Sequence, residues 1–346
     1  MNRNTLVHWY DRLTGLLKKL PKELHGPILK ELSPVREFFL AGRPARIMFI
    51  GDPDASSYPD FLKALCGRDF KTVTQIKGWT RWEAADHGCV DARVDDAEDI
   101  AALNALEPDV IIALHNPKNT SHPAQDRLQK AVSENAFSVP ILILENEDGK
   151  IATIGQRTSA LCRLDARGSI MVATNFKEIP DVLCEMLPPQ ARLEMARVSD
   201  ARASQKQIAD TLLKSFAAIC GVIGLQPIPL ADLPVLTSLQ MLLVGLIVHA
   251  SGRKLSIKSI GEFMGALGVG IGAAFAFREG ARTLVRFLPI WGNAVSGGVA
   301  AIGTYAIGKS AIAYFIEGLP QHEVRKIFKS LKSRRQQSKL PPGDKR

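Results

Sequence analysis

The stretch RIMFIGDPDASSY, residues 46–58, decides the fold of the N-terminal half of the chain. Its first five residues form an apolar run typical of a buried strand, Gly51 follows as a turn, and the segment after Tyr58 has the composition of a helix. A strand, a glycine turn and a helix in this order are the setting of a phosphate-binding loop. The pattern that binds nucleotide phosphates is G-x-x-x-x-G-K-[ST]. This chain has Ser56, Ser57 and Tyr58 in its last three places.

The composition describes a folded chain with room for two domains. Its 346 residues are 46% hydrophobic and 23% charged. The five cysteines are far apart and include no C-x-x-C pair, so neither a disulfide framework nor a metal site is indicated. Residues 1–25 lack the continuous apolar core of a signal peptide, because basic residues interrupt the leucines. We therefore expect a reducing, cytoplasmic setting.

Residues 45–190 alternate short apolar runs with helical segments. The runs are apolar throughout, which suits strands of a parallel sheet covered by helices. We predict an α/β domain over residues 45–190, with an amphipathic helical segment over residues 1–44 packed on it. The predicted strands are residues 46–50, 88–90, 109–114, 139–144 and 169–173.

A second composition begins after a polar, charged segment, residues 191–206, which we predict to be a linker. Residues 207–320 read as an all-α, glycine-rich hydrophobic domain. Two stretches within it, residues 233–252 and 287–308, contain no formally charged residue. Their lengths only reach the threshold for spanning a bilayer, so a membrane-associating domain and a compact soluble bundle both fit.

Basic residues concentrate at two places in the C-terminal half. The basic tail, residues 321–346, holds nine Lys/Arg and two Asp/Glu, a net charge of +7 out of +9 for the chain. A second group consists of three arginines spaced four residues apart, which form one stripe on a predicted helix. We expect such groups to contact lipid head groups or a protein partner, the alternative being a solvated surface. The candidate contact residues are Arg278, Arg282, Arg286, Trp291, Arg334 and Arg335.

Residues 45–190 resemble the translation-factor class of bacterial GTPases. In that class the loop is followed by D-x-x-G, which serves magnesium and the γ-phosphate, and by N-K-x-D, which reads the guanine. Asp91 stands at the first of these motifs, with Val94 in place of its glycine. Asp148 stands at the second, with Glu145 in place of its asparagine.

These departures remove groups that hold a nucleotide. Ser57 replaces the lysine that faces the β- and γ-phosphates, and Tyr58 replaces the hydroxyl that binds magnesium. Asp54 adds repulsion of roughly 4 kcal/mol if its carboxylate lies about 4 Å from a phosphate oxygen at an effective dielectric near 20. The resemblance therefore implies a degenerate nucleotide site and no catalytic residue. The residues of that site would be Gly51, Ser56, Ser57, Tyr58, Asp91 and Asp148.

The helical domain resembles the C-terminal domain of the YcjF-like inner-membrane protein family. Residues 226–234, 289–298 and 303–308 carry this resemblance, which implies a place at the cytoplasmic face of the bacterial inner membrane. Two G-x-x-x-G spacings, within residues 261–265 and 268–272, would let helices approach closely, so self-association is a further expectation.

The sequence favours a pseudo-GTPase, a non-catalytic, membrane-associated binding or scaffold protein that needs no cofactor. The first alternative is a divergent switch protein that binds GTP or GDP with magnesium. The second alternative is a pore-forming or membrane-remodelling protein that acts through the glycine-rich helices. We expect a protein partner and a membrane surface, and we do not expect nucleic acid.

Overall fold

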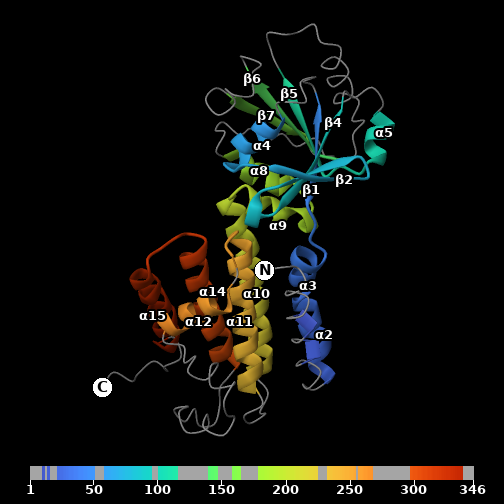
Figure 1. Cartoon of the computed structure of the whole chain (residues 1–346). Coiled ribbons are helices and arrows are strands. Elements are labelled where there is room, and N and C mark those ends of the chain that lie inside the picture. The colour runs from blue at the N-terminus through green and yellow to red at the C-terminus, as the bar shows by residue number, and fades with distance from the viewer. Residues whose placement is uncertain are drawn as a thin grey trace, which may run out of the picture. The chain divides into compact units, whose positions relative to one another are not determined.

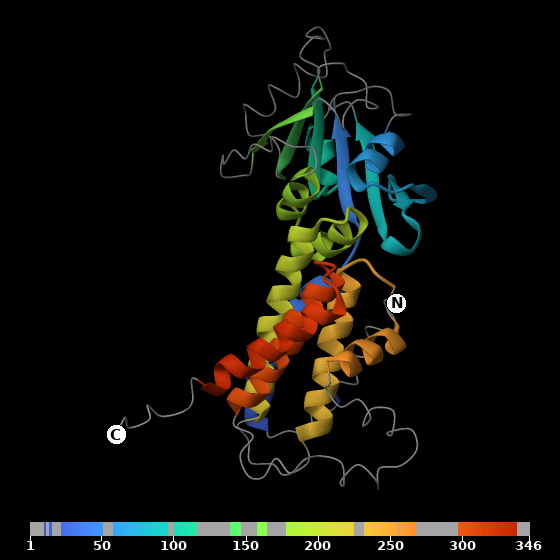
Figure 2. The ribbon, with the colours of Figure 1, turned by 90° about the vertical axis from the view of Figure 1, so that its left-hand side faces the viewer.

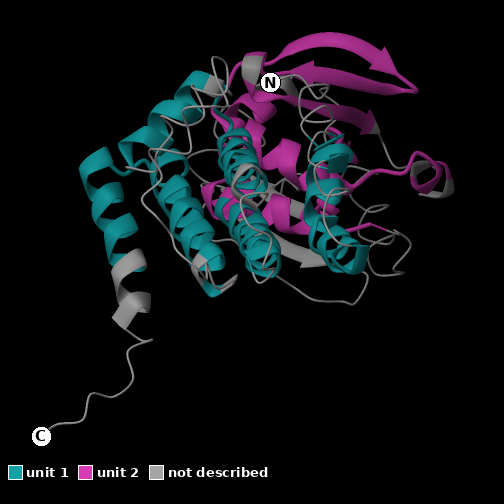
Figure 3. Ribbon diagram, turned by 90° about the horizontal axis from the view of Figure 1, so that it is seen from below, with its two compact units in different colours: residues 1–40, 206–346 teal, residues 41–205 magenta. Residues whose placement is uncertain are grey.

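The chain folds into two compact units, one built on a sheet and one built of helices (Figure 1). Residues 41–205 form the α/β unit, and residues 1–40 together with 206–346 form the helical unit (Figure 3). The α/β unit is therefore inserted into the sequence of the helical unit. The computed structural model describes residues 10–11, 14–15, 22–50, 58–95, 100–115, 139–146, 158–164, 178–224, 232–254, 256–267 and 297–337.

A seven-stranded mixed sheet forms the centre of the α/β unit. Its strands are β1 (Ala45–Ile50), β2 (Lys71–Ile76), β3 (Trp79–Glu83), β4 (Cys89–Asp95), β5 (Val110–His115), β6 (Ile141–Asn146) and β7 (Thr158–Leu164). Their order across the sheet is β2-β3-β4-β1-β5-β6-β7. The central strands β4, β1, β5 and β6 are parallel, whereas the pairs β2–β3, β3–β4 and β6–β7 are antiparallel.

The four parallel strands confirm the strands predicted from apolar runs, and the prediction for residues 169–173 falls outside the described residues. The expectation of a purely parallel sheet was wrong at the edges. Strands β2 and β3 form a hairpin whose turn holds Lys77 and Gly78 at φ of 50° and 81°. Every residue of β2 is exposed, so this strand has no apolar run by which to be recognised.

Helices pack on the sheet and on one another within the α/β unit. They are α4 (Tyr58–Cys66), α5 (Ile100–Ala105), α8 (Ile179–Met186) and α9 (Pro189–Val198). The ring of Phe61 in α4 meets the ring of Phe49 in β1 edge-on, with 5.4 Å between centroids. Both side chains are fully buried, and α9 packs against β1 and β4. The four consecutive residues 47–50 are all fully buried, so β1 is covered on both faces, as its unbroken apolar sequence requires.

Residues 191–206, which the sequence suggested to be a linker, are mostly helical, and those up to residue 205 belong to the α/β unit and are hydrogen-bonded into it. The backbone N–H of Ser204 donates to the carboxylate of Asp181 at 2.9 Å, which caps the first turn of α10 (Arg202–Gly224). Arg68 Nε donates to the carbonyl of Val198, the last residue of α9, at 3.0 Å. The Gln205 side chain donates to the carbonyl of Ala196 at 2.9 Å.

The helical unit is built around three long helices. Its elements are α2 (Lys22–Glu31), α3 (Ser33–Val35), a π-helical turn (Arg36–Leu40), the greater part of α10, α11 (Asp232–Ala250), α12 (Ile257–Ala266), α14 (Gly297–Phe315) and α15 (Gln321–Gln337). Helices α10 and α14 run antiparallel, because Lys206 pairs with Glu317 at 2.5 Å and Asp210 pairs with Lys309 at 2.6 Å. Helix α11 packs against α14 (Figure 2).

The N-terminal segment belongs to the helical unit and not to the α/β unit on which we expected it to pack. The ring of Phe39 lies 5.7 Å from the imidazole of His249 in α11. Phe39 and His249 are both buried, at 4% and 6% exposure. Phe39 is thus buried beside a helix of the chain that follows residue 206.

Candidate functional site

The four parallel strands bring their carboxyl ends to one edge of the sheet, which we call the carboxyl edge. Ile50, the last residue of β1, is in register with Asp95 of β4 and with Ala113 of β5, and His115 is in register with Glu145 of β6. In open α/β sheets, ligands bind at this edge where the chain changes sides. Strand β1 lies at such a point, because the chain continues to β4 on one side of it and then to β5 on the other.

The frame around the predicted phosphate loop is present. Strand β1 ends at Ile50 and α4 begins at Tyr58, so the loop leaves from the carboxyl edge and enters a helix N-terminus. A helix N-terminus offers backbone N–H groups to an anion. The predicted site residues Gly51, Ser56, Ser57 and Asp148 lie outside the described residues, and the side chain of Tyr58 is not described.

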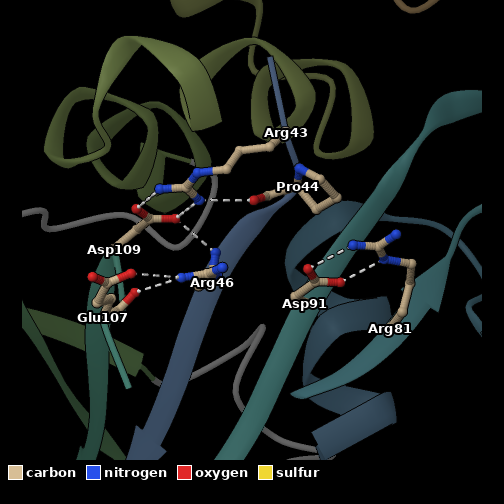
Figure 4. A network of polar contacts seen from close by, with 7 residues as sticks. All are labelled: Arg43, Pro44, Arg46, Arg81, Asp91, Glu107 and Asp109. Atoms are coloured by element: carbon tan, nitrogen blue, oxygen red, sulfur yellow. Dashed lines mark hydrogen bonds and ion pairs between the residues drawn. The ribbon is translucent and has the colours of Figure 1, made fainter. Parts of the chain in front are cut away.

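Asp91 does not lie at the carboxyl edge, which corrects its assignment to the magnesium position. It is in register with Arg46, near the start of β1 and four residues from Ile50. At about 3.3 Å per residue this places Asp91 roughly 13 Å from the edge. Its carboxylate is held by Arg81 of β3, at 2.7 Å from Nε and 2.8 Å from an Nη (Figure 4).

The Arg81–Asp91 pair is a structural ion pair. The two residues stand directly opposite each other on antiparallel strands, and only 9% of the Asp91 side chain is exposed. Two parallel N–H donors match two carboxylate oxygens, the strongest geometry for such a pair. The hydrogen bond to Asp91 raises the pKa of Arg81 above its ordinary value. This carboxylate is therefore already satisfied.

Asp95 occupies the backbone position that the sequence assigned to Asp91. Asp95 is the last residue of β4 and is in register with Ile50 of β1. Ile50 directly precedes Gly51 in the sequence. We missed it because we predicted the strand to end at Val90, where the apolar run stops. Strand β4 continues because Arg81 neutralises Asp91, so a charged residue can stand inside the sheet.

A second polar network fastens the opposite ends of the strands (Figure 4). Arg43 makes two 2.6 Å hydrogen bonds to the carboxylate of Asp109, which also accepts from the backbone N–H of Arg46 at 2.8 Å. Arg46 pairs more loosely with Glu107, at 3.4 Å. The hydrogen bond to Asp109 raises the pKa of Arg43. Because this network sits at the amino ends of β1 and β5, its role is to fix the strands rather than to bind at the carboxyl edge.

The described thiols are unsuited to chemistry at neutral pH. Burial raises the pKa of Cys89 to about 11 and those of Cys184 and Cys220 to about 12, and it also raises the pKa of Cys66. Such thiols stay protonated and are weak nucleophiles. Within the part of the chain that the structure describes, no three His, Cys, Asp or Glu side chains gather as a metal site.

The candidate contact residues of the helical unit are only partly placed. Arg334 and Arg335 lie in the last turns of α15, with side chains that are not described. Arg278, Arg282, Arg286 and Trp291 fall outside the described residues.

The described glycines of this unit differ in their surroundings. A Cβ on Gly265 of α12 would meet nothing within 4 Å, so no described helix approaches this face of its G-x-x-x-G spacing. Close approach occurs instead at Gly308 of α14, where a Cβ would lie 2.4 Å from Leu213 and 3.2 Å from Leu243.

One helix of the described part of the chain has the length and composition of a membrane span. Among the described residues, α10 is long and apolar enough to cross a bilayer, with a mean hydropathy of 1.3 in its best window. More than half of that window, 56%, is buried inside the protein, as in the core helix of a soluble bundle. Length and composition of this helix therefore do not distinguish a core helix from a span.

Comparison with known proteins identifies no family for this chain. No protein-family model matches it, and no curated protein is significantly similar in sequence. The architecture that stands is an N-terminal mixed α/β sheet domain and a mainly helical C-terminal region.

Proposed function

We propose that the protein is a pseudo-GTPase, a GTPase-like module that binds partners without hydrolysing nucleotide and serves as a scaffold at the cytoplasmic face of a bacterial inner membrane. The frame supports a GTPase-like origin. A loop of the right length joins β1 to α4 at the carboxyl edge, at the point where the chain changes sides of the sheet.

The residues of the loop carry the proposed absence of catalysis, and the place of Asp91 agrees with it. Asp91, the acid that matched the magnesium motif, is held by Arg81 about 13 Å from the loop. The loop itself offers Ser57 and Tyr58 where a lysine and a small hydroxyl residue are needed. Phosphoryl transfer depends on positioning and on positive charge at the phosphates, so losing the loop lysine and the small hydroxyl residue removes most of its support, and the acid at Asp95 replaces neither group.

A divergent GTP switch is the second candidate, and the position of Asp95 favours it. The backbone of Asp95 stands beside the start of the loop, where an acid can serve a magnesium ion through water. The N-terminus of α4 adds backbone donors for phosphate. A nucleotide held in this way would bind weakly and without the loop lysine.

Rebuilding the loop tests the GTPase-like origin of the frame. The triple variant Ser56→Gly, Ser57→Lys, Tyr58→Thr restores the pattern G-x-x-x-x-G-K-[ST]. We expect calorimetric titration with GTP and magnesium to give saturable binding for this variant and at least tenfold weaker binding for the unchanged protein. A folded triple variant that binds no GTP would contradict the proposal that this edge derives from a nucleotide site.

Matched substitutions separate the two candidate functions. In the rebuilt variant, Asp95→Asn should weaken magnesium-dependent binding, whereas Asp91→Asn should leave it unchanged, because Asp91 serves Arg81. GTP binding by the unchanged protein that is lost on Asp95→Asn would favour the switch over the scaffold.

A further inference from the structure

Helix α15 has one face fixed to the helical unit and another turned to solvent. Val324 and Phe328 are 2% and 8% exposed, and α15 packs on α14 (Figure 2). Arg325, Lys326 and Lys329 are exposed on the other sides of the same turns. The burial pattern is that of an amphipathic helix whose apolar stripe is already used.

The start of α15 is also tied to a second helix. Arg325 Nε donates to the carbonyl of Ala266, the last residue of α12, at 2.6 Å. A guanidinium at this place satisfies a carbonyl that has no partner inside its own helix and suits the negative end of the helix dipole. Helix α15 is thus held on α12 and α14, and its charged side has a fixed orientation in the helical unit.

The charge of α15 is almost entirely of one sign. Its 17 residues include six Lys/Arg and a single acid, Glu323, a net charge of +5. It follows α14, whose 19 residues carry one charged side chain, Lys309. A cluster of four to eight basic residues on an amphipathic helix, or directly after an apolar one, is typical of binding to anionic lipid head groups.

We infer that the exposed basic side of α15 docks the helical unit on an anionic lipid surface by charge alone, without inserting the helix. The inference rests on the proposed membrane association and names its lipid class and its contact surface. Because Val324 and Phe328 are buried inside the helical unit, the apolar stripe of α15 is not available to enter the acyl region. Attraction of this kind is reversible and is screened by salt.

The lipid reading is favoured over nucleic acid by what surrounds the charges. The exposed residues of α15 between Gln321 and Ser330 include no Phe, Tyr or Trp on which a base could stack, and their one aromatic ring is that of His322. The helix also packs on α14, which carries one charged residue, Lys309. The experiment below includes an oligonucleotide, so that binding to nucleic acid would also be detected.

Vesicle sedimentation of the full chain tests the inference. The probes are vesicles of phosphatidylcholine alone and of phosphatidylcholine mixed with phosphatidylglycerol, at salt near 0.1 M and near 1 M, where the Debye length falls from about 10 Å to about 3 Å. The test variant is Lys326→Glu with Lys329→Glu. The matched control is Lys71→Glu with Lys77→Glu, which changes the net charge equally at two exposed lysines of the α/β unit.

We expect binding only to the anionic vesicles, a loss of at least about tenfold at high salt, and a similar loss for the α15 variant but not for the control. Equal loss in both variants would overturn the inference, since net charge would then explain it. Unchanged binding by the α15 variant would also overturn it, while leaving membrane association itself in place. No binding to either vesicle would refute both proposals about the membrane, and binding to a duplex oligonucleotide that vesicles cannot displace would replace lipid by nucleic acid.

Discussion

At the scale of single residues, the ion pair between Arg81 and Asp91 shows how one contact changes the interpretation of a motif. The sequence offers Asp91 as a ligand for magnesium, and the structure uses it to cross-link β3 and β4. A carboxylate that is nearly buried, paired with a guanidinium and about 13 Å from the carboxyl edge cannot reach an ion bound there. The match of Asp91 to the magnesium motif therefore reflects a structural role of this residue and not a role in binding a metal ion.

Removing Arg81 should destabilise the α/β unit. Arg81→Ala leaves the nearly buried Asp91 without its partner, and we expect the free energy of unfolding to fall by about 2 to 3 kcal/mol, since 29% of the Arg81 side chain is exposed and screens the loss. Chemical denaturation measures it. Lys71→Ala on exposed β2 is the control and should change stability by less than about 0.5 kcal/mol. Equal effects of the two substitutions would show that the pair contributes nothing.

The buried thiols predict an alkaline limit to stability. Burial raises the pKa of Cys184 and Cys220 from 9.0 to about 12, so the folded protein holds both protons at a pH where the unfolded chain releases them. Their contribution is therefore complete below pH 9 and is lost as the pH rises toward 12, by about 1 kcal/mol for each thiol at pH 10. The measurement is the free energy of unfolding between pH 8 and 10.5, for the unchanged protein and for Cys184→Ala. A slope that the substitution does not reduce would refute this assignment.

At the scale of elements, the close contact of α10, α11 and α14 depends on Gly308. We expect Gly308→Ala to destabilise the helical unit by about 1 to 3 kcal/mol, because its Cβ would overlap Leu213 and press on Leu243. Gly303, on the same helix, has nothing within 4 Å of a Cβ, so Gly303→Ala should stabilise by up to about 1 kcal/mol through helix propensity. Thermal unfolding of the two variants compares them directly. Destabilisation by both, or by neither, would contradict the packing described for α14.

The elements that the sequence predicts are those whose residues are almost all apolar or uncharged. Strands β1, β5 and β6 are apolar runs buried in the centre of the sheet, and α11 and α14 are nearly free of charge. The hairpin of β2 and β3 was missed because its stability comes from pairing along an edge, and exposed strands carry no apolar run.

The candidate site was predicted only in outline. The glycine turn after β1 locates the loop, since a strand and a helix on either side of it are local features. The position of Asp95 could not be read from the sequence, because it follows from the register of β4 against β1, a contact between residues some 45 positions apart. Cross-strand partners such as Arg81 are non-local in the same sense, and they decide whether an acid is available.

At the scale of the whole molecule, the two ends of the chain build one unit and the middle builds the other. The order of compositions along the sequence, helical, then α/β, then helical, does not show that the first segment joins the last. Burial of Phe39 beside His249 establishes that connection. The consequence is that the N-terminal segment stabilises the C-terminal helices.

Deleting residues 1–40 should therefore weaken the helical unit and spare the α/β unit. We expect amide hydrogen exchange to quicken in α11 around His249, whose packing surface is uncovered, and to stay unchanged in β1 and β5. Loss of protection confined to the sheet would contradict the assignment of this segment to the helical unit.

Release of phosphate from GTP in the presence of magnesium tests most directly the proposal that the protein is a pseudo-GTPase, which does not hydrolyse nucleotide. We predict a rate for the purified, folded protein that equals the rate of buffer alone, with Asp95→Asn indistinguishable from the unchanged protein. Magnesium-dependent turnover that disappears on Asp95→Asn and persists on Asp91→Asn would contradict the claim and make the carboxyl edge an active site.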